Sequence, residues 1–425
     1  MTSRNVLIWN PAAGARLAAE ILALVRQSLA ESGQTFTEYE TDAPEHASKI
    51  GVELRSQAHG ESASEPLTVI LLGGDGTTQE FLSGLFESCS DQQQLPDLRI
   101  VLVPTGTANA LYSALYPPAS SSRHEPLEDS TQHGWRLRSL RAYISSLKPA
   151  KAEGSFRLYP LTLANTTVHE EDSIPKEVLT HLITSHALHA AILRDSEELR
   201  ESHPGIERFK MAAQKNVTSW IDGELVLRRA PTAGLPLQKY NPRSRKFDEV
   251  EGEGSVVEGP FFYIASMTTD RLEPSFVPAP FGFAEASSSA SSSSLARPPQ
   301  CLDVVLIRPL KDPQVQGEST LQARQTFAEK RVTPITQGMY DEGKHVNLVY
   351  PTVEGRLEER IREDVEGVDV IDYWRVGGWE WTPVSGRKGH AVLNIHLRAH
   401  THPRSPSTAS RLYSRRSRLS RRRID

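Results

Sequence analysis

Three glycines and an aspartate share one short loop of the sequence, Gly73-Gly74-Asp75-Gly76-Thr77, which follows an apolar run. Because glycine has no Cβ, such a loop can turn several main-chain N–H groups toward a phosphate. The helix expected to follow it would add the partial positive charge of its N-terminus. The Asp75 carboxylate could there bind Mg²⁺ or take a proton from an attacking hydroxyl. An ordinary strand–turn–helix corner also uses such glycines, so this loop alone leaves both interpretations open.

Three more loops of similar character support the phosphate interpretation. Small and hydroxyl-bearing residues follow another apolar run at Pro104-Thr105-Gly106-Thr107-Ala108-Asn109-Ala110. Two further runs end in polar turns, at Asn10-Pro11-Ala12-Ala13-Gly14 and at Thr41-Asp42-Ala43-Pro44. If the four runs are parallel strands, these loops lie along one edge of a sheet, where open α/β sheets bind ligands. The sequence therefore predicts a nucleotide site at that edge.

The elements that must position these loops alternate along the chain. Apolar or alternating runs predict strands over 6–9, 35–41, 67–72 and 99–103, and helical spacing predicts helices over 17–28, 44–54, 77–86 and 108–115. A polar linker over 118–133 and a helix over 136–146 follow. This alternation is typical of a parallel sheet with right-handed crossovers. We expect an α/β nucleotide-binding domain over residues 1–150.

The pattern changes from residue 154 onward. Strands are predicted over 157–164, 224–228, 260–267, 302–308 and 345–350, with one good helix over about 176–200. This composition predicts a second, mostly-β domain over 151–385. A serine-rich insertion over 286–300 interrupts it, and the Arg- and Ser-rich residues 386–425 are interpreted as a basic disordered tail.

Composition excludes several classes of protein. The 425 residues suffice for two or three domains, and 48 Lys+Arg against 53 Asp+Glu give a formal net charge of −5. A net acidic chain argues against a nucleic-acid partner. Two cysteines exclude a disulfide scaffold or a cysteine-rich zinc module, and no apolar run predicts a transmembrane segment. We expect a cytoplasmic protein, with the arginine-rich end as a candidate for peripheral contact with anionic membranes.

Taken together, the motifs resemble the diacylglycerol kinase catalytic domain family, which includes sphingosine, ceramide and bacterial lipid kinases. The residues that carry the resemblance are Asn10-Pro11-x-x-Gly14, Thr41, Gly73-Gly74-Asp75-Gly76-Thr77, Glu80 and the loop from Pro104 to Ala110. It covers residues 4–117 well and is patchier over 155–385. The GGDGT element alone is also found in NAD kinases and phosphofructokinases, and the Pro-x-Gly-Thr-x-Asn-Ala loop favours the lipid-kinase branch.

The resemblance implies a two-domain kinase with an NAD-kinase-like α/β domain and a β-sandwich domain, between which ATP and a lipid head group would meet. It implies Asp75 as the candidate catalytic base and Mg²⁺ as a bridge between phosphate oxygens. The implied nucleotide-binding residues are Asn10, Thr41, Gly73, Gly74, Gly76, Thr77, Glu80, Thr105, Gly106 and Thr107. Arg200 and Arg208 match the family's phosphate-contacting arginines, with a solvated helix face as the alternative. No set of protein ligands for a metal is predicted.

Three departures from the family pattern bear on the substrate. Where the sphingosine kinase-like branch has an acidic residue for the lipid head group, this chain has Leu193. Asp195 lies close by but out of register, which weakens the case for an amino-alcohol substrate. Pro299-Gln300-Cys301 stands where some bacterial members hold a structural Mg²⁺. No Asp-Gly-Glu strand follows residues 370–381, and Asp222-Gly223-Glu224 lies too early in the chain to replace it.

The sequence thus predicts an ATP-dependent lipid kinase that phosphorylates a hydroxyl of diacylglycerol, a sphingoid base or a related lipid, with ATP and Mg²⁺ as cofactors. One alternative is an NAD kinase or another small-molecule kinase of the same fold. A second, motivated by the missing terminal strand, is a nucleotide- or lipid-binding pseudokinase.

Overall fold

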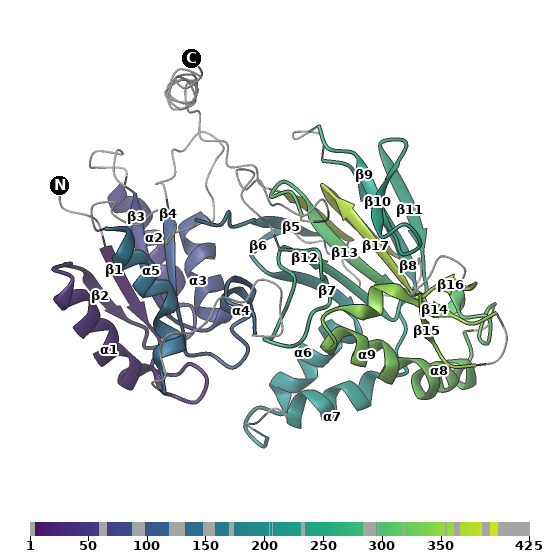
Figure 1. The fold of residues 1–425 in the computed structure, drawn as a ribbon, viewed down its shortest axis with the longest axis horizontal. Helices are drawn as coiled ribbons and strands as arrows, with labels where there is room; N and C mark the ends of the chain where they lie inside the picture. Colours follow the sequence, from purple (N-terminus) through teal and green to yellow (C-terminus); the bar gives the residue numbers. More distant parts are fainter. Residues whose placement is uncertain are drawn as a thin grey trace, which may run out of the picture.

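The chain folds into an α/β part followed by a part built from antiparallel sheets (Figure 1). The computed structural model describes residues 5–58, 66–86, 98–118, 132–147, 158–169, 174–203, 205, 207–230, 234–283, 295, 297–317, 319–352, 355–360 and 366–384, and the backbone of 392–397. The predicted fold class is confirmed. The predicted domain limit near 150 lies outside the described residues and stays a prediction.

A four-stranded parallel sheet organises the α/β part. Its order is β2-β1-β3-β4, made of β1 (Asn5–Trp9), β2 (Thr37–Glu40), β3 (Leu67–Gly73) and β4 (Leu98–Pro104). Successive side chains of a strand point to opposite faces. Ile8 and Val69 therefore pack toward α2 (His46–Ala58) and α3 (Asp75–Phe86), whereas Leu7 and Ile70 pack toward α1 (Ala18–Glu31) and α5 (Arg138–Ser146). The short helices α4 (Ala110–Leu115) and η1 (Gly134–Leu137) follow β4.

Two six-stranded antiparallel sheets form a sandwich in the C-terminal part. The first sandwich sheet has the order β10-β9-β17-β13-β12-β7 and the second β11-β8-β18-β19-β5-β6. Their strands are β5 (Ala164–His169), β6 (Lys176–Thr180), β7 (Ile183–Ala187), β8 (Gly223–Arg228), β9 (Leu237–Asn241), β10 (Lys246–Val250), β11 (Gly254–Glu258), β12 (Tyr263–Met267), β13 (Leu302–Ile307), β17 (Ile371–Val376), β18 (Gly378–Pro383) and β19 (Val392–Leu397). Leu227 and Trp379 of the second sheet share a buried cluster with Val304 and Trp374 of the first, so the sheets pack face to face.

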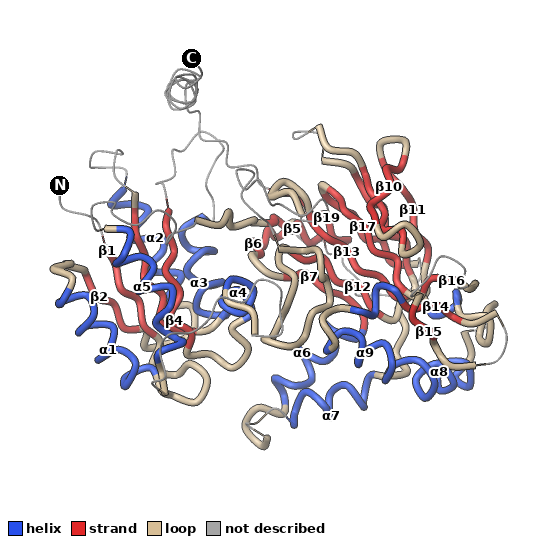
Figure 2. Tube along the Cα trace, viewed as in Figure 1, coloured by secondary structure: helices blue, strands red, loops and turns tan. Residues whose placement is uncertain are grey.

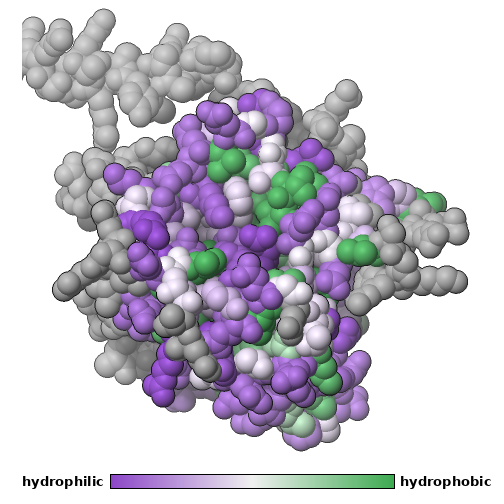
Figure 3. Space-filling view, turned by 90° about the vertical axis from the view of Figure 1, so that its right-hand side faces the viewer, coloured by the Kyte–Doolittle hydropathy of each residue, from purple (hydrophilic) through white to green (hydrophobic). Residues whose placement is uncertain are grey.

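Helices cover the other face of the first sandwich sheet (Figure 2). They are α6 (Leu188–Glu198), α7 (Glu207–Asn216), α8 (Leu321–Phe327), the π-helical turn η4 (Ala328–Val332) and α9 (Thr333–Tyr340). The short turns η3 (Pro309–Lys311) and η5 (Lys344–Asn347) and a small sheet of β14 (Leu348–Tyr350), β15 (Glu358–Glu359) and β16 (Val368–Asp369) complete this side. On the face in Figure 3, hydrophilic side chains predominate and hydrophobic ones form small separate groups, as on most protein surfaces.

The prediction of one helix over 176–200 is wrong in its first half. Residues 176–187 form β6 and β7, and helix α6 begins only at Leu188. Val178 and Ile183 are β-branched and favour strands, and β6 is an edge strand whose exposed side makes its apolar pattern sparse. The strand predicted over 157–164 is also displaced, because residues 158–163 are not in a strand and β5 begins at Ala164.

The sandwich continues into the segment assigned to the tail. Residues 392–397 form β19, which pairs with β18 and β5 inside the second sandwich sheet. Leu393, Ile395 and Leu397 alternate with polar residues, a strand period hidden by the surrounding arginines and serines. The other residues of the predicted tail lie outside the described residues, as do 286–294 and 296 of the predicted insertion.

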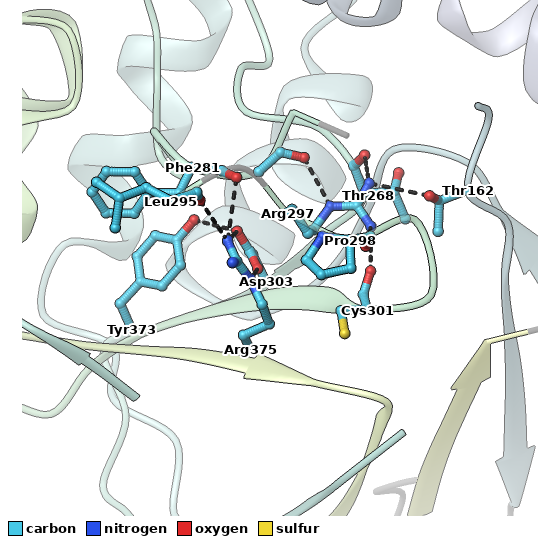
Figure 4. A network of polar contacts seen from close by, with 11 residues as sticks. Thr162, Thr268, Phe281, Leu295, Arg297, Pro298, Cys301, Asp303, Tyr373 and Arg375 are labelled. Atoms are coloured by element: carbon cyan, nitrogen blue, oxygen red, sulfur yellow. Dashed lines mark hydrogen bonds and ion pairs between the residues drawn. The ribbon is translucent and has the colours of Figure 1, made fainter. Parts of the chain in front are cut away.

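Arg297, at the end of the predicted insertion, is buried with 1% of its surface exposed. Its guanidinium donates to five acceptors drawn from separate loops: Gly282 O at 2.8 Å, Thr268 O at 2.6 Å, Thr162 Oγ1 at 3.1 Å, Pro298 O at 3.2 Å and Cys301 O. Beside it, Asp303 accepts from Tyr373 at 2.6 Å and from Arg375 at 3.0 Å (Figure 4). This network holds the loops at one end of the first sandwich sheet together.

Replacing Arg297 by Met should lower the free energy of unfolding by about 3 kcal/mol, because several buried oxygens lose their donor at once. Denaturant unfolding followed by intrinsic fluorescence measures the change. The matched control is Arg229→Met, at an exposed arginine paired with Glu253, where about 1 kcal/mol or less is expected. Equal losses for the two variants would contradict the assigned role of Arg297.

Candidate functional site

The polar loops that the sequence singles out meet along one edge of the parallel sheet. Each strand pairing continues one residue past the strand end, through main-chain hydrogen bonds of 2.9 Å from Asn10 N to Leu72 O, Thr41 N to Trp9 O and Thr105 N to Gly73 O. Because all four strands run the same way, Asn10, Thr41, Gly74 and Thr105 line the carboxyl edge. We call this edge, with the loops after β1, β3 and β4, the glycine rim.

The loops of the glycine rim touch main chain to main chain. A Cβ on Gly106 would lie 2.5 Å from Cα of Gly74, and a Cβ on Gly14 would lie 2.3 Å from the carbonyl oxygen of Thr105. Gly14 also has a φ of +53°, which side-chain-bearing residues rarely adopt. The rim is therefore a surface of backbone, open to a ligand that recognises N–H groups.

Two asparagines fix the shape of the rim. Asn10 donates its Nδ2–H to Oγ1 of Thr77 at 2.9 Å, which joins the end of β1 to the first turn of α3. Asn109 accepts from Gly106 N at 2.9 Å and donates to Gly106 O at 2.8 Å, which closes the loop before α4. Asn109 stands at φ +52°, a conformation that asparagine tolerates better than most residues. It belongs to the motif but was not predicted as a site residue.

Asp75, the first residue of α3, reaches across to the N-terminus of α4. Its Oδ2 accepts from Ala110 N at 2.8 Å and its Oδ1 from Leu111 N at 3.3 Å. Burial raises the pKa of Asp75, and the hydrogen bonds from Ala110 and Leu111 oppose this rise. Asp75 thus caps α4 and joins the two helices that start at the rim, while each carboxylate oxygen keeps a further lone pair.

The other predicted rim residues differ in exposure. Thr41, Thr77 and Thr105 are buried, whereas Gly76 and Thr107 are exposed, and Glu80 lies half-buried in the second turn of α3. Among the described residues, buried Thr105 Oγ1 finds no hydrogen-bond partner. A buried hydroxyl without a partner costs free energy, and a phosphate oxygen at the loop would supply an acceptor.

A cation that sequence analysis missed lies at the same edge. Arg136, half-buried in η1, donates to the carbonyl oxygen of Pro104, the last residue of β4, and stacks 4.4 Å above the ring of Trp135. Thirty-two residues separate Arg136 from Pro104 in sequence, so no local pattern could reveal the contact. It places a guanidinium at the rim.

The two predicted arginines lie in the C-terminal part. Arg200 follows α6, is 60% exposed and pairs with Glu197 at 2.7 Å. Arg208 lies in α7, is buried, and holds its guanidinium 4.7 Å above the ring of Phe209. Their contact with a nucleotide stays a prediction.

Asp195, near the position where sphingosine kinase-like proteins place an acidic residue, joins α6 to α7. It accepts from Asn216 Nδ2 at 2.7 Å and pairs with Lys215 at 2.9 Å and Arg194 at 2.8 Å. Hydrogen bonds from Arg194, Asn216 and Lys215 hold the pKa of this carboxyl well below its usual range. Its partners thus come from the protein, and nearby Leu193 is exposed but apolar.

Neither a ready-made metal cage nor a spanning helix is present in the described ranges. Within them, no three His, Cys, Asp or Glu side chains are grouped so that they could hold a metal ion. The helices within them are too short or too polar to cross a bilayer.

Residues 4–135 match the family model of the diacylglycerol kinase catalytic domain. This match covers about a third of the chain and shows what its α/β part is similar to. Sphingosine kinase B of Dictyostelium discoideum is 30% identical over 109 residues, which make up 26% of this chain and only 13% of that protein's length. The matched residues include all of the glycine rim, together with Trp135, the neighbour of Arg136.

Solved structures with similar folds have low sequence identity. A protein from Bacillus anthracis str. Sterne, described as a diacylglycerol kinase, gives a TM-score of 0.45 at 12% identity, with 93% of this chain and 94% of that chain covered. Yeast NADH kinase in complex with NADH gives 0.31 at 9% identity, with 94% and 81% covered.

Replacing Gly106 by Ala should lower the free energy of unfolding by about 2 kcal/mol, because the new methyl group meets the backbone of Gly74 and the loops must separate. Gly76→Ala is the matched change, since nothing lies within 4 Å of its added Cβ. There we expect a gain of up to about 1 kcal/mol from helix propensity. Thermal unfolding of both variants measures this, and equal effects would contradict main-chain contact in the rim.

Asp195 should make the protein sensitive to acid. Because its pKa is lower in the folded than in the unfolded state, its stabilisation is present above the ordinary pKa near 4 and is lost as pH falls below it. Asp195→Asn should therefore reduce stability at pH 7 and flatten the acid side of the stability profile. Midpoints of thermal unfolding between pH 7 and pH 2.5 check this, and parallel profiles would contradict it.

Proposed function

We propose that this chain is an ATP-dependent lipid kinase that transfers phosphate to a hydroxyl of diacylglycerol, a sphingoid base or a related lipid. The observation that carries the proposal is the glycine rim, with Asp75 at the start of α3 between two loops of bare backbone. The match of residues 4–135 to the model of the diacylglycerol kinase catalytic domain supports a lipid acceptor.

The rim supports nucleotide binding through main-chain donors. The first intrahelical bond of α3 runs from Thr78 N to Gly74 O, so the N–H groups of Asp75, Gly76 and Thr77 precede the helical ladder. Such groups, with the helix dipole, stabilise phosphate oxygens. We assign the nucleotide to Asn10, Thr41, Gly73, Gly74, Gly76, Thr77, Glu80, Thr105, Gly106 and Thr107, with Arg200 and Arg208 from the C-terminal part as candidates for the transferred phosphate.

Asp75 is proposed to accept the proton of the lipid hydroxyl. As the hydroxyl oxygen bonds to the γ-phosphorus, the bond from that phosphorus to the bridging oxygen breaks and ADP leaves. A carboxylate whose pKa burial raises is a stronger base at neutral pH. In nucleotide sites Mg²⁺ takes one or two carboxylates and otherwise phosphates and water, and Asp75 is the carboxylate that could contribute here. When bound, Mg²⁺ neutralises charge on the phosphate oxygens.

One observation favours a second candidate function, a nucleotide-binding protein that does not transfer phosphate. Both carboxylate oxygens of Asp75 already accept main-chain N–H groups of α4, so the residue has a structural task whether or not it acts as a base. We propose the lipid kinase because a capping carboxylate keeps lone pairs for a substrate hydroxyl. A lipid acceptor implies work at a membrane surface, and we propose a cytoplasmic enzyme in peripheral contact with it.

Asp75→Asn should separate the role of Asp75 in phosphate transfer from its role as the cap of α4. An amide keeps one acceptor for α4 but cannot take the proton, so the rate of phosphate transfer should fall about 10²- to 10⁴-fold while ATP binds within a few-fold of wild type. Asp75→Ala should also lose about 1 kcal/mol of stability with the cap. Transfer from γ-labelled Mg-ATP is measured with dispersed diacylglycerol, sphingosine and ceramide, and with NAD.

The outcomes of this assay differ between the candidate functions. Label in a lipid that depends on Asp75 supports the proposal. Label in NAD alone assigns a small-molecule kinase, and ATP binding by calorimetry without any labelled product assigns a pseudokinase. If Asp75→Asn transfers phosphate at the wild-type rate, Asp75 is not the catalytic base.

A further inference from the structure

The side chain of Gln79 links α3 to the C-terminal part of the chain. Its Nε2 donates to the carbonyl oxygen of Leu179 in β6 and, at 3.0 Å, to Oγ of Ser83 in α3. Its Oε1 lies 2.7 Å from Nδ1 of His181, in the turn between β6 and β7. One amide thus holds two points of the sandwich against the helix that begins with Asp75.

The partner histidine is fixed in place and in protonation state. Because the amide nitrogen of Gln79 already serves as a donor, its oxygen faces the ring, and His181 must carry its proton on Nδ1. Burial lowers the pKa of His181 to about 4, so the ring is neutral near pH 7. On its other side, the main-chain oxygen of His181 accepts from Oγ1 of Thr268 at 2.5 Å.

The surroundings of this contact are apolar. Leu163 and Leu179 of the C-terminal part share one buried cluster with Phe81 of α3 and Tyr112 of α4. Figure 1 shows α3 and α4 on the side of the α/β part that faces β5 and β6. Apolar side chains resist separation but are not directional, whereas the hydrogen bonds of Gln79 fix the position of α3 along this contact.

Asp75 and Gln79 are four residues apart on α3 and so lie on one face of the helix, one turn from each other. Asp75 holds the N-terminus of α4, and Gln79 holds the β6–β7 turn. A shift of α3 against the sandwich therefore moves the Asp75 carboxylate with it. For a transfer between reactants held by different domains, a misplacement of about 1 Å can cost about 10²-fold in rate.

We propose that Gln79 and His181 are positioning residues, which fix α3 against the C-terminal part of the chain, where the lipid acceptor would bind. In this role the pair acts through α3 and controls the approach of the acceptor hydroxyl to Asp75. This deepens the proposed function and rests on it for the identity of the reaction, whereas the mechanical connection can be tested without turnover.

The kinetic test removes the hydrogen bond between Gln79 and His181 by changing one residue or the other. Gln79→Leu and His181→Phe place an apolar side chain of similar shape at each position and remove the hydrogen bond, and His181→Asn restores a donor close to the place of Nδ1. We expect the two disruptive variants to lower kcat for lipid phosphorylation at least 10-fold while KM for ATP stays within twofold. His181→Asn should recover most of kcat. The double variant Gln79→Leu/His181→Phe should be no slower than either single one.

Gln27→Leu is the matched control, because Gln27 is exposed on α1 and bonds only within its own helix to Glu31. Its kcat should equal that of wild type. A merely structural role predicts lower unfolding temperatures with unchanged kcat in the folded variants. That result, or a His181→Asn variant as slow as His181→Phe, would overturn the proposal.

Hydrogen exchange separates failure of this inference from failure of the proposed function. Mg-ATP should slow amide exchange at residues 179–184 in wild type and in Gln27→Leu, and leave it unchanged in Gln79→Leu. If wild type transfers no phosphate but shows this protection, the connection stands and the kinase proposal fails. If ATP binds and the protection is equal in wild type and Gln79→Leu, the connection between the two parts is refuted.

Discussion

The contact on which the α/β part depends is the direct packing of three loops, backbone on backbone, at Gly14, Gly74 and Gly106. No side chain fits between these loops, so the space above them is lined by N–H and C=O groups and the first turn of α3. The same closeness lets the carboxylate of Asp75 span from α3 to the first residues of α4. Side chains of ordinary size would push the loops apart and remove both the backbone surface and the cap.

In the C-terminal part, buried charges hold neighbouring segments together. Asp372 is buried at the start of β17, where Lys239 and Arg308 lie 2.9 Å from its oxygens and Lys311 lies at 3.1 Å. Burial would raise the pKa of Asp372, but these three cations hold it well below its usual range. Taking ions out of water is costly, and a buried ion with partners from strand β9 and from the η3 turn favours one arrangement of these segments. These ionic contacts fix the relative position of segments in the C-terminal part, as the glycine contacts do in the rim.

The sequence predicted the α/β part well because its signals are local. β1 and β3 are buried throughout and appear as unbroken apolar runs, and the glycines of the rim are visible because no other residue type serves there. The strand β6 was not predicted because it is an edge strand in which three of the five side chains are exposed. Contacts between distant residues leave no trace in a local pattern: 32 residues separate Arg136 from Pro104, and 102 separate His181 from Gln79. The glycine loops of the site could therefore be predicted from the sequence, whereas the long-range contacts that hold them could not.

The helix α3 combines three tasks within its first five residues. Its N-terminus offers main-chain donors, Asp75 caps α4, and Gln79 holds the β6–β7 turn. In the proposed reaction the phosphate donor would lie at the parallel sheet and the lipid acceptor at the sandwich, so the rate of transfer would depend on how α3 sets the two against each other. The connection through His181 uses its neutral ring, and the unfolded chain binds the proton more readily between the ordinary histidine pKa near 6.5 and the folded value of about 4. The connection is therefore at full strength at neutral pH and loses its contribution to stability as pH falls through that range, so α3 stays aligned wherever the cytoplasmic chemistry proposed for Asp75 would operate.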